Sequence, residues 1–203
     1  MVGGFAHPII LFADAFNLAI ADIAVEALAM LAVDDNPLHK ILDAPHQAPG
    51  RALPALEILD RAREDPRFDN LFDSPGVGNT GIVLRSSTAR AALLEHFHTF
   101  DIGCPDNASE KLNELAKAAV LLLVAVNPPG TKYGIDQYLA HQITFVWSAR
   151  VLIPILSPAA MQTLLRAVWL IMLLRHITQL RPKIVPARLG GGSLPVDGPS
   201  EEW

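Results

Sequence analysis

The sequence predicts an all-α protein of about six helices. Alanine and leucine, both strong helix formers, supply much of the 51% hydrophobic content. Apolar residues also recur at three- and four-residue spacings in most of the long segments. No segment alternates convincingly between apolar and polar residues as a strand does, and no internal repeat is evident. The 203 residues therefore predict one helical domain over 1–184 and a flexible tail over 185–203.

The most strongly patterned stretch is a helical hairpin near 136–181, which we expect to form the core. Ser157 can cap its second helix, Pro158 fits the first helical position, and Pro182 is expected to stop it. An apolar stripe at helical spacing runs along this second helix and must be buried. Its members are Met161, Leu164, Leu165, Val168, Ile171 and Met172.

The first half of the chain predicts two helices separated by connectors. Pro8–Val33 carries a helical pattern along its whole length, and Pro54–Arg63 predicts a short amphipathic helix. Prolines punctuate Pro45–Pro54, which we expect to be a connector. Prolines, glycines and scattered aspartates predict a long surface loop near 65–85.

Two further helices are indicated by their starting residues. Ser86 or Ser87 can cap a helix that runs to about Thr99. Asn107 followed by Glu110 resembles a capping box, in which each side chain bonds the other residue's backbone, and apolar residues follow at helical spacing. The glycine- and proline-rich end of the chain has little to bury, which predicts a disordered tail.

Composition excludes several classes of function. The formal net charge is −5, and no basic stripe marks a nucleic-acid surface, so we expect no nucleic acid as a partner. Asp22 and Glu26 interrupt the first apolar stretch, and Pro154 and Pro158 interrupt the last, so we expect no membrane span. The N-terminus lacks the basic start of a signal peptide, and the default localisation is cytoplasmic. Cys104 alone forms neither an intrachain disulfide nor a cysteine metal cage.

Three motifs favour structural interpretations over chemical ones. Gly76–Gly81 matches the GxGxxG pattern of dinucleotide sites, but no strand is expected before it and the next helix is expected several residues later. His96 and His98 point to opposite sides of a helix, so we expect two surface or half-buried histidines. His176 is placed where a positive charge suits a helix C-terminus.

His141 is the most interesting histidine because it lies inside the predicted core hairpin. Tyr138, Phe145 and Ser148 share or border its helix face. A lone histidine in such a place is more often a hydrogen-bonded core residue than a functional one. No GxSxG elbow accompanies a serine, so hydrolase chemistry is not indicated.

Two stretches, Gly3–Leu42 and Asp136–Pro182, resemble the questin oxidase-like family of fungal and bacterial proteins. The resemblance covers about half of the chain in the right order. It implies an oxidoreductase of secondary metabolism that acts on aromatic polyketides such as anthraquinones, by Baeyer–Villiger-type or ring-cleaving oxygenation. It also implies a small aromatic substrate and is compatible with NADPH as electron donor.

The resemblance further implies a non-haem Fe(II) site, because family members look able to hold iron with histidines. His7 and His141 then become the expected metal ligands, with no separate cofactor-binding residues. Tyr138 and Gln142 become the expected catalytic neighbours that shape an aromatic pocket. Imidazole is a suitable iron ligand, and oxygen insertion needs such a redox centre.

The chain also departs from the family pattern. The family usually has H-P-x-x-H, whereas this chain has His7, Pro8 and then Leu11, with Asp14 as a speculative substitute ligand. Typical members are about twice as long, so we expect a partial copy. The alternative is a truncated, catalytically inactive helical domain that binds an apolar ligand or a partner helix, and a homo-oligomer is compatible with either.

Overall fold

The computed structural model describes residues 6–33, 37–45, 50–126 and 136–189. These residues contain nine α-helices and no strand, which confirms the all-α prediction and exceeds the six helices expected. Two additional short helices and the division of one expected helix into two account for the difference, and all three have weak sequence signals. The helices are α1 (His7–Leu18), α2 (Ala21–Val33), α3 (His39–Leu42), α4 (Ala55–Glu64), α5 (Asn79–Arg85), α6 (Ser87–Thr99), α7 (Ala108–Val124), α8 (Gln137–Leu152) and α9 (Pro158–Thr178).

Helix α9 is the centre of the molecule, as the hairpin prediction requires. It packs against α8, α7, α6 and α4, and every residue from 164 to 178 is buried. The Ser157 hydroxyl accepts a hydrogen bond from the Ala160 amide at 3.3 Å, which confirms the predicted cap. The helix ends at Thr178, however, before Pro182, because Leu180 and Arg181 adopt left-handed backbone angles (φ 65° and 53°).

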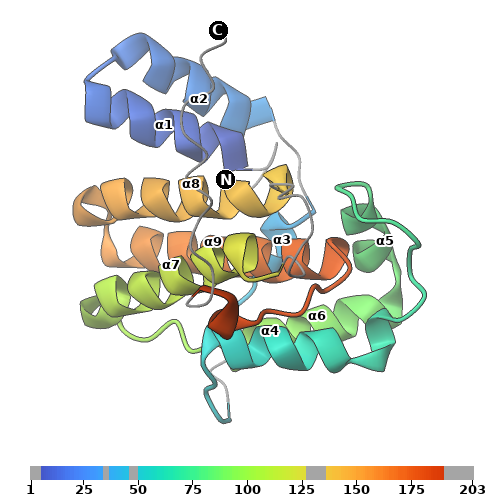
Figure 1. Cartoon of the computed structure of the whole chain (residues 1–203). Coiled ribbons are helices and arrows are strands. Elements are labelled where there is room, and N and C mark those ends of the chain that lie inside the picture. The colour runs from blue at the N-terminus through green and yellow to red at the C-terminus, as the bar shows by residue number, and fades with distance from the viewer. Residues whose placement is uncertain (1–5, 34–36, 46–49, 127–135, 190–203) are drawn as a thin grey trace, which may run out of the picture.

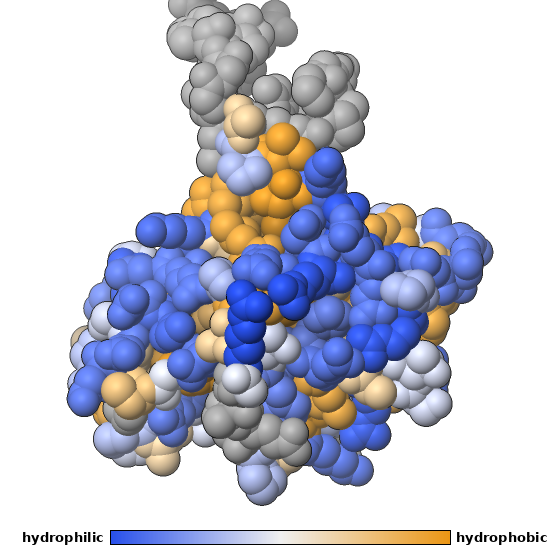
Figure 2. Space-filling view, turned by 90° about the horizontal axis from the view of Figure 1, so that it is seen from below, coloured by the Kyte–Doolittle hydropathy of each residue, from blue (hydrophilic) through white to orange (hydrophobic). Residues whose placement is uncertain are grey.

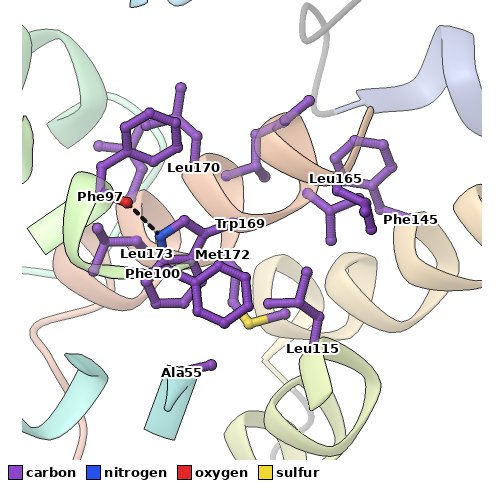
Figure 3. Packing of buried hydrophobic residues seen from close by; sticks show 14 of the residues in the cluster. Ala55, Phe97, Phe100, Leu115, Phe145, Leu165, Trp169, Leu170, Met172 and Leu173 are labelled. Atoms are coloured by element: carbon purple, nitrogen blue, oxygen red, sulfur yellow. Dashed lines mark hydrogen bonds between the residues drawn. The ribbon is translucent and has the colours of Figure 1, made fainter. Parts of the chain in front are cut away.

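Aromatic side chains pack in the hydrophobic core around α9 (Figure 3). The Trp169 indole stacks at a tilt on Phe100, with ring centroids 4.8 Å apart. Its Nε1–H donates to the carbonyl oxygen of Phe97 at 3.1 Å, so the one polar atom of the buried ring is satisfied. α6 is thereby tied to α9 by both packing and a hydrogen bond.

The helices form stacked layers in Figure 1. α1 and α2 lie together at one end of the molecule, α1 packs on α8, and α8 in turn packs on α9. α7 lies beside α8 and α9, while α4 and α6 cover the opposite side of α9. Seen from that opposite end, the surface is mostly hydrophilic (Figure 2).

The single helix expected over Pro8–Val33 is wrong, because the chain folds there into two helices. Ala19 takes a left-handed conformation (φ 56°), and the Ile20 amide bonds the carbonyl oxygen of Ala15 at 2.9 Å. An alanine in this conformation costs about 1–2 kcal/mol, which is why glycine normally marks such a turn. Without that glycine, the sequence shows an uninterrupted helical pattern.

The prediction of a loop near 65–85 is wrong at both ends of this range, where the chain forms helical turns. Pro66–Phe68 forms a short 3₁₀ turn with Phe68 buried, and α5 already begins at Asn79. The helix therefore starts inside the GxGxxG stretch rather than after it. The described residues contain no strand before that stretch, so the dinucleotide interpretation still lacks its context.

Helices α6 and α7 begin as expected but with one different cap. The Ser86 hydroxyl accepts a hydrogen bond from the Ala89 amide, which selects Ser86 over Ser87 as the cap of α6. The capping box at Asn107 is wrong, because Asn107 ends a 3₁₀ turn and its side chain makes no capping bond.

The predicted tail is described only in its first residues. The Val185 amide donates to the carbonyl oxygen of Ala125 at 3.0 Å, and Pro186–Leu189 forms a 3₁₀ turn. Residues 190–203 lie outside the described part of the chain. Among the described residues, α9 is the one helix long and apolar enough to cross a membrane, but 78% of its most apolar window is buried inside the protein.

Candidate functional site

The structure brings His7 and His141 together, although 134 positions separate them in the chain. His7 is the first residue of α1, and His141 lies in the second turn of α8, on which α1 packs. The two Nε2 atoms are 3.1 Å apart, and the ring centroids are 5.1 Å apart. The two histidines that the family resemblance named thus lie in contact, and their role as metal ligands stays a prediction.

The hydrogen bonds indicate an arrangement of protons on the two neutral rings. His141 Nδ1 bonds the carbonyl oxygen of Gln137, and because a carbonyl only accepts, Nδ1 carries the proton. In the neutral His141 ring, Nε2 is then an acceptor, and His7 Nε2–H donates to it. Helix α8 therefore holds His141 with its Nε2 facing His7.

Arg175 is a buried cation next to this histidine pair, and the sequence analysis did not identify it. It is only 7% exposed, and its Nη1 donates to the carbonyl oxygen of Tyr138 at 2.8 Å. Burial lowers the pKa of Arg175 to about 10, while the nearby Asp136 carboxylate partly opposes the shift. The only trace of this role in the sequence is an arginine within the apolar run of the core helix.

The surroundings also keep His7 neutral. Partial burial lowers the pKa of His7, and the positive charges of a protonated His141 and of Arg175 lower it further. A neutral imidazole has a lone pair for a proton or a metal ion. The pair is thus an acceptor site beside a fixed positive charge.

The resemblance implies an iron ion, and the spacing of the two imidazoles suits two of its ligands. Two imidazoles bound at about 2.1 Å and at right angles to one ion have nitrogens about 3.0 Å apart, close to the observed 3.1 Å. Within the described ranges, however, no group of three histidine, cysteine, aspartate or glutamate residues could hold a metal. Asp14 is two helical turns from His7, about 10 Å along α1, and is no third ligand. The pair therefore has the spacing for two coordination positions of one ion.

Tyr138 and Gln142, the expected catalytic neighbours, occupy different surroundings. Tyr138 is half-buried one turn before His141, and its carbonyl oxygen accepts from Arg175. Gln142 is fully buried, and its amide oxygen, when turned toward Arg175, accepts from Nε and Nη1 at 3.1 and 3.2 Å. Gln142 therefore helps to orient Arg175, whose charge acts on His7, and the role of Gln142 in an aromatic pocket stays a prediction.

An apolar cavity that α1 and α8 help to form has neither histidine in its lining. This cavity of about 200 Å³ opens between α1, α2, α8 and α9, and all of its lining is apolar. Its lining residues are Ile9, Phe12, Leu28, Leu31, Leu152, Leu156, Ala160 and Leu164. It shares α1 and α8 with the histidine pair.

Two other histidines turn out to be structural. His96 is buried rather than half-exposed, because its Nε2 bonds the Asp65 carboxylate at 2.8 Å. His176 is also buried, and its Nε2 bonds the carbonyl oxygen of Leu59 at 3.1 Å. Burial lowers the pKa of His176 to about 4, so the charge that we expected at the helix C-terminus is absent near neutral pH.

Comparison with known proteins supports the family resemblance and extends it. The comparison with curated proteins returns no match. The family model described as questin oxidase-like matches residues 1–201, nearly the whole chain and more than the two stretches that carry the resemblance. The match includes α1, α8 and α9, which supply His7, His141 and Arg175. The chain therefore belongs to the questin oxidase-like family.

Proposed function

We propose that this chain is an oxidoreductase that oxygenates or ring-cleaves aromatic polyketides of the anthraquinone type, with His7 and His141 at its reactive centre. Membership of the questin oxidase-like family supports the oxidoreductase class, and the substrate and the iron belong to the proposal. The observation that carries the proposal is the 3.1 Å contact between the two imidazoles near a buried arginine.

In this proposal His7 and His141 hold non-haem iron through their Nε2 atoms, with the proton of the neutral His7 ring moved from Nε2 to Nδ1. Iron supplies the redox chemistry by which ground-state oxygen reacts with a closed-shell aromatic ring. The bond from His141 Nδ1 to the carbonyl oxygen of Gln137 orients the imidazole and keeps its Nε2 available, as outer hydrogen bonds do for metal-binding histidines. The lowered pKa of His7 keeps its ring neutral, the form that binds a metal.

Arg175 contributes a fixed positive charge near the pair. A phenolic hydroxyl of a hydroxyanthraquinone ionises more readily beside a buried guanidinium, because the cation stabilises the phenolate. Gln142 and the Tyr138 carbonyl oxygen hold the guanidinium in place. NADPH as electron donor rests on the family resemblance and belongs to the same proposal.

The test is anaerobic reconstitution of the full chain with Fe(II), followed by iron analysis and oxygen uptake with a hydroxyanthraquinone and NADPH. We expect near-stoichiometric iron and substrate-dependent oxygen uptake in the wild type and in His39→Ala, a control histidine on α3. Both should be lost in His7→Ala and His141→Ala. Iron that stays bound without either histidine would refute the site, and an iron-loaded chain without oxygen uptake would refute the activity.

A catalytically inactive domain that binds an apolar ligand is the second candidate function. The cavity of about 200 Å³ with an entirely apolar lining favours it, since a dry cavity of about 150 Å³ already holds a benzene ring. Naphthalene binding that survives His141→Ala but is lost when Leu164→Trp fills the cavity would support this function. Unchanged binding in Leu164→Trp would exclude it.

A further inference from the structure

A small cavity lies beside the first turns of α9, and its volume is about 230 Å³. The residues that line it are Ile102, Gly103, Ala159, Gln162, Thr163 and Arg166. The last four recur at three- and four-residue spacings, so they share one face of the helix. The other two follow α6 in the chain. The cavity therefore lies between one face of α9 and the segment that leaves α6.

Arg166 is a buried cation that has no carboxylate partner within the described residues. Its exposed fraction is 8%, and it forms no salt bridge with an aspartate or glutamate of that part of the chain. Arg67 and Arg181, by contrast, each pair with a carboxylate, at 2.6 and 2.8 Å. Burial lowers the pKa of Arg166, and the Asp43 carboxylate only partly opposes the shift. Since an isolated charge is costly to bury, a negative group beside Arg166 would stabilise it.

Two backbone carbonyl groups hold the Arg166 guanidinium in place. Its Nη2 donates to the carbonyl oxygens of Ile41 at 3.3 Å and Ala44 at 2.9 Å, at the end of α3. Its Nε–H group is buried and has no hydrogen-bond partner among the described residues. Carbonyl oxygens satisfy donors of the guanidinium, but they carry only partial charge and do not neutralise it. Arg166 therefore places a fixed, uncompensated positive charge at the cavity.

The N-terminus of α9 adds to the positive potential of the cavity. Ala159 is the second residue of this helix, and the first amides of a helix have no acceptor within it. The aligned peptide dipoles place a partial positive charge at this end of the helix, which favours a nearby anion. The cavity thus combines a helix N-terminus with a buried guanidinium, and both favour a negative group.

The neighbouring charges and the apolar part of the lining indicate the kind of anion. Asp43 acts on the charge of Arg166, and the Asp101 carboxylate accepts a hydrogen bond from the Gly103 amide at 2.8 Å. Two carboxylates in the vicinity disfavour an anion with more than one charge. Ile102 offers contact to an apolar group, and a cavity of about 150 Å³ already holds a benzene ring. These features favour a monocarboxylate with a small apolar body, about the size of benzoate.

We propose that this cavity binds a small monocarboxylate whose carboxylate group lies against the Arg166 guanidinium and whose apolar body contacts Ile102. The site is separate from the histidine pair. Arg166 and Arg175 are nine residues apart on α9, which places them about 13.5 Å apart along the axis and about 180° apart around it. The cavity is therefore on a different face of α9 from the arginine near His7 and His141. Carboxylate binding here depends neither on iron nor on the proposed oxidation.

The test is benzoate binding to the metal-free full chain at pH 7 and low salt, measured by isothermal titration calorimetry. We expect a dissociation constant at least about 10-fold higher in Arg166→Gln, which keeps N–H donors but removes the charge. Arg90→Gln removes the same charge from an exposed position on α6 and should leave the affinity unchanged. Benzamide, a neutral isostere of benzoate, should bind the wild type at least about 10-fold more weakly.

A second variant keeps the proposal testable if Arg166→Gln fails to fold. Ala159 is an exposed lining residue, so Ala159→Trp can fill the cavity while Arg166 stays in place. Benzoate binding should be lost in this variant, and circular dichroism checks that each variant is folded.

Three results would overturn the proposal. The first is a folded wild type that does not bind benzoate at about 10 mM. The second is wild-type affinity for benzoate in folded Arg166→Gln or Ala159→Trp, which would place the benzoate elsewhere, for instance in the apolar cavity between α1 and α8. The third is benzamide that binds as tightly as benzoate. Inorganic phosphate that binds more tightly than benzoate would also overturn the assignment to a monocarboxylate.

Discussion

His176 Nε2 donates to the carbonyl oxygen of Leu59 at 3.1 Å and so joins the core helix α9 to α4. The other ring nitrogen, Nδ1, is buried and has no hydrogen-bond partner among the described residues. Burial is the main reason that the pKa of His176 falls to about 4, and the nearby Arg181 and Arg63 lower it further. The folded protein therefore holds this imidazole neutral where an unfolded chain would protonate it.

The free energy of unfolding should therefore fall as the pH drops from about 7 toward 4. An ordinary histidine titrates near pH 6.5, so between the two pKa values the unfolded chain binds a proton that the folded chain excludes. His176→Gln keeps an N–H donor for Leu59 and removes the titration, so its stability should depend less on pH in this window. Urea unfolding at several pH values measures the difference.

His7 must be controlled for in that experiment, because its pKa is also lowered in the folded state. His7→Gln removes its contribution while leaving His176 in place. The prediction fails if His176→Gln has the same pH dependence of unfolding free energy as the wild type.

Arg181 should contribute more to stability than Arg61, an arginine on the exposed side of α4. The Arg181 guanidinium donates to the carbonyl oxygens of Arg63 and Asp65 at 3.1 and 2.9 Å and to the Asp69 carboxylate at 2.8 Å. Arg181→Ala leaves the carbonyl groups at the end of α4 without these donors, so we expect a loss of about 2 kcal/mol.

The matched control is Arg61→Ala, because Arg61 makes one ion pair on the exposed side of α4. Such surface pairs contribute about 0–1 kcal/mol. Urea denaturation of both variants measures their losses of unfolding free energy. Equal losses would mean that the bonds from Arg181 to the carbonyl oxygens contribute little.

Asp65 should make the protein sensitive to acid. Burial alone would raise the pKa of this carboxyl, but hydrogen bonds from Arg67 and His96 outweigh it and hold the pKa well below its usual range. A lowered carboxylate pKa stabilises the fold above the unfolded value of about 3.9, and this stability is lost as the pH falls below it.

Asp65→Asn should therefore be less stable than the wild type at pH 7 and lose less stability on acidification to about pH 3. The exposed Asp60, which pairs with Arg63 at the surface, gives the control variant Asp60→Asn. Thermal unfolding followed by circular dichroism at pH 7, 5 and 3 is sufficient. A parallel pH response in wild type and Asp65→Asn would contradict the assignment.

The sequence predicted the parts of the fold that local patterns determine. Ser157 with Pro158 located the start of α9 because a hydroxyl cap and a proline are local devices. The turn at Ala19 was missed because alanine gives no local sign of a left-handed backbone, which here is imposed by the packing of α1 and α2. Phe68 was placed in a loop because its burial depends on contacts with distant segments.

The same distinction applies to the candidate site. Helical spacing alone left His141 as an ordinary core histidine, and only the family resemblance paired it with His7. Arg175 was missed because its role depends on a contact between α8 and α9 that no spacing within one helix reveals. His176 was misassigned because its position near a helix end outweighed its burial, which a single sequence does not show.

The titration of His7 provides a direct test of the histidine pair in the metal-free protein. In EDTA-treated wild type, the pKa of His7 should lie below the ordinary 6.5, because burial and the positive charges of His141 and Arg175 disfavour its protonation. His141→Gln removes one of these charges, so the pKa of His7 should rise while remaining below 6.5.

Two-dimensional NMR of the imidazole Cε1–H groups follows this titration, and the signal lost in His7→Gln assigns the resonance. His39→Gln is the control, because His39 lies on α3 and is not among the groups that shift the pKa of His7. An unchanged His7 pKa in His141→Gln would show that the two rings do not interact in solution. A rise in that variant alone would establish the close contact on which the proposed metal site depends, independently of iron loading and of catalytic activity.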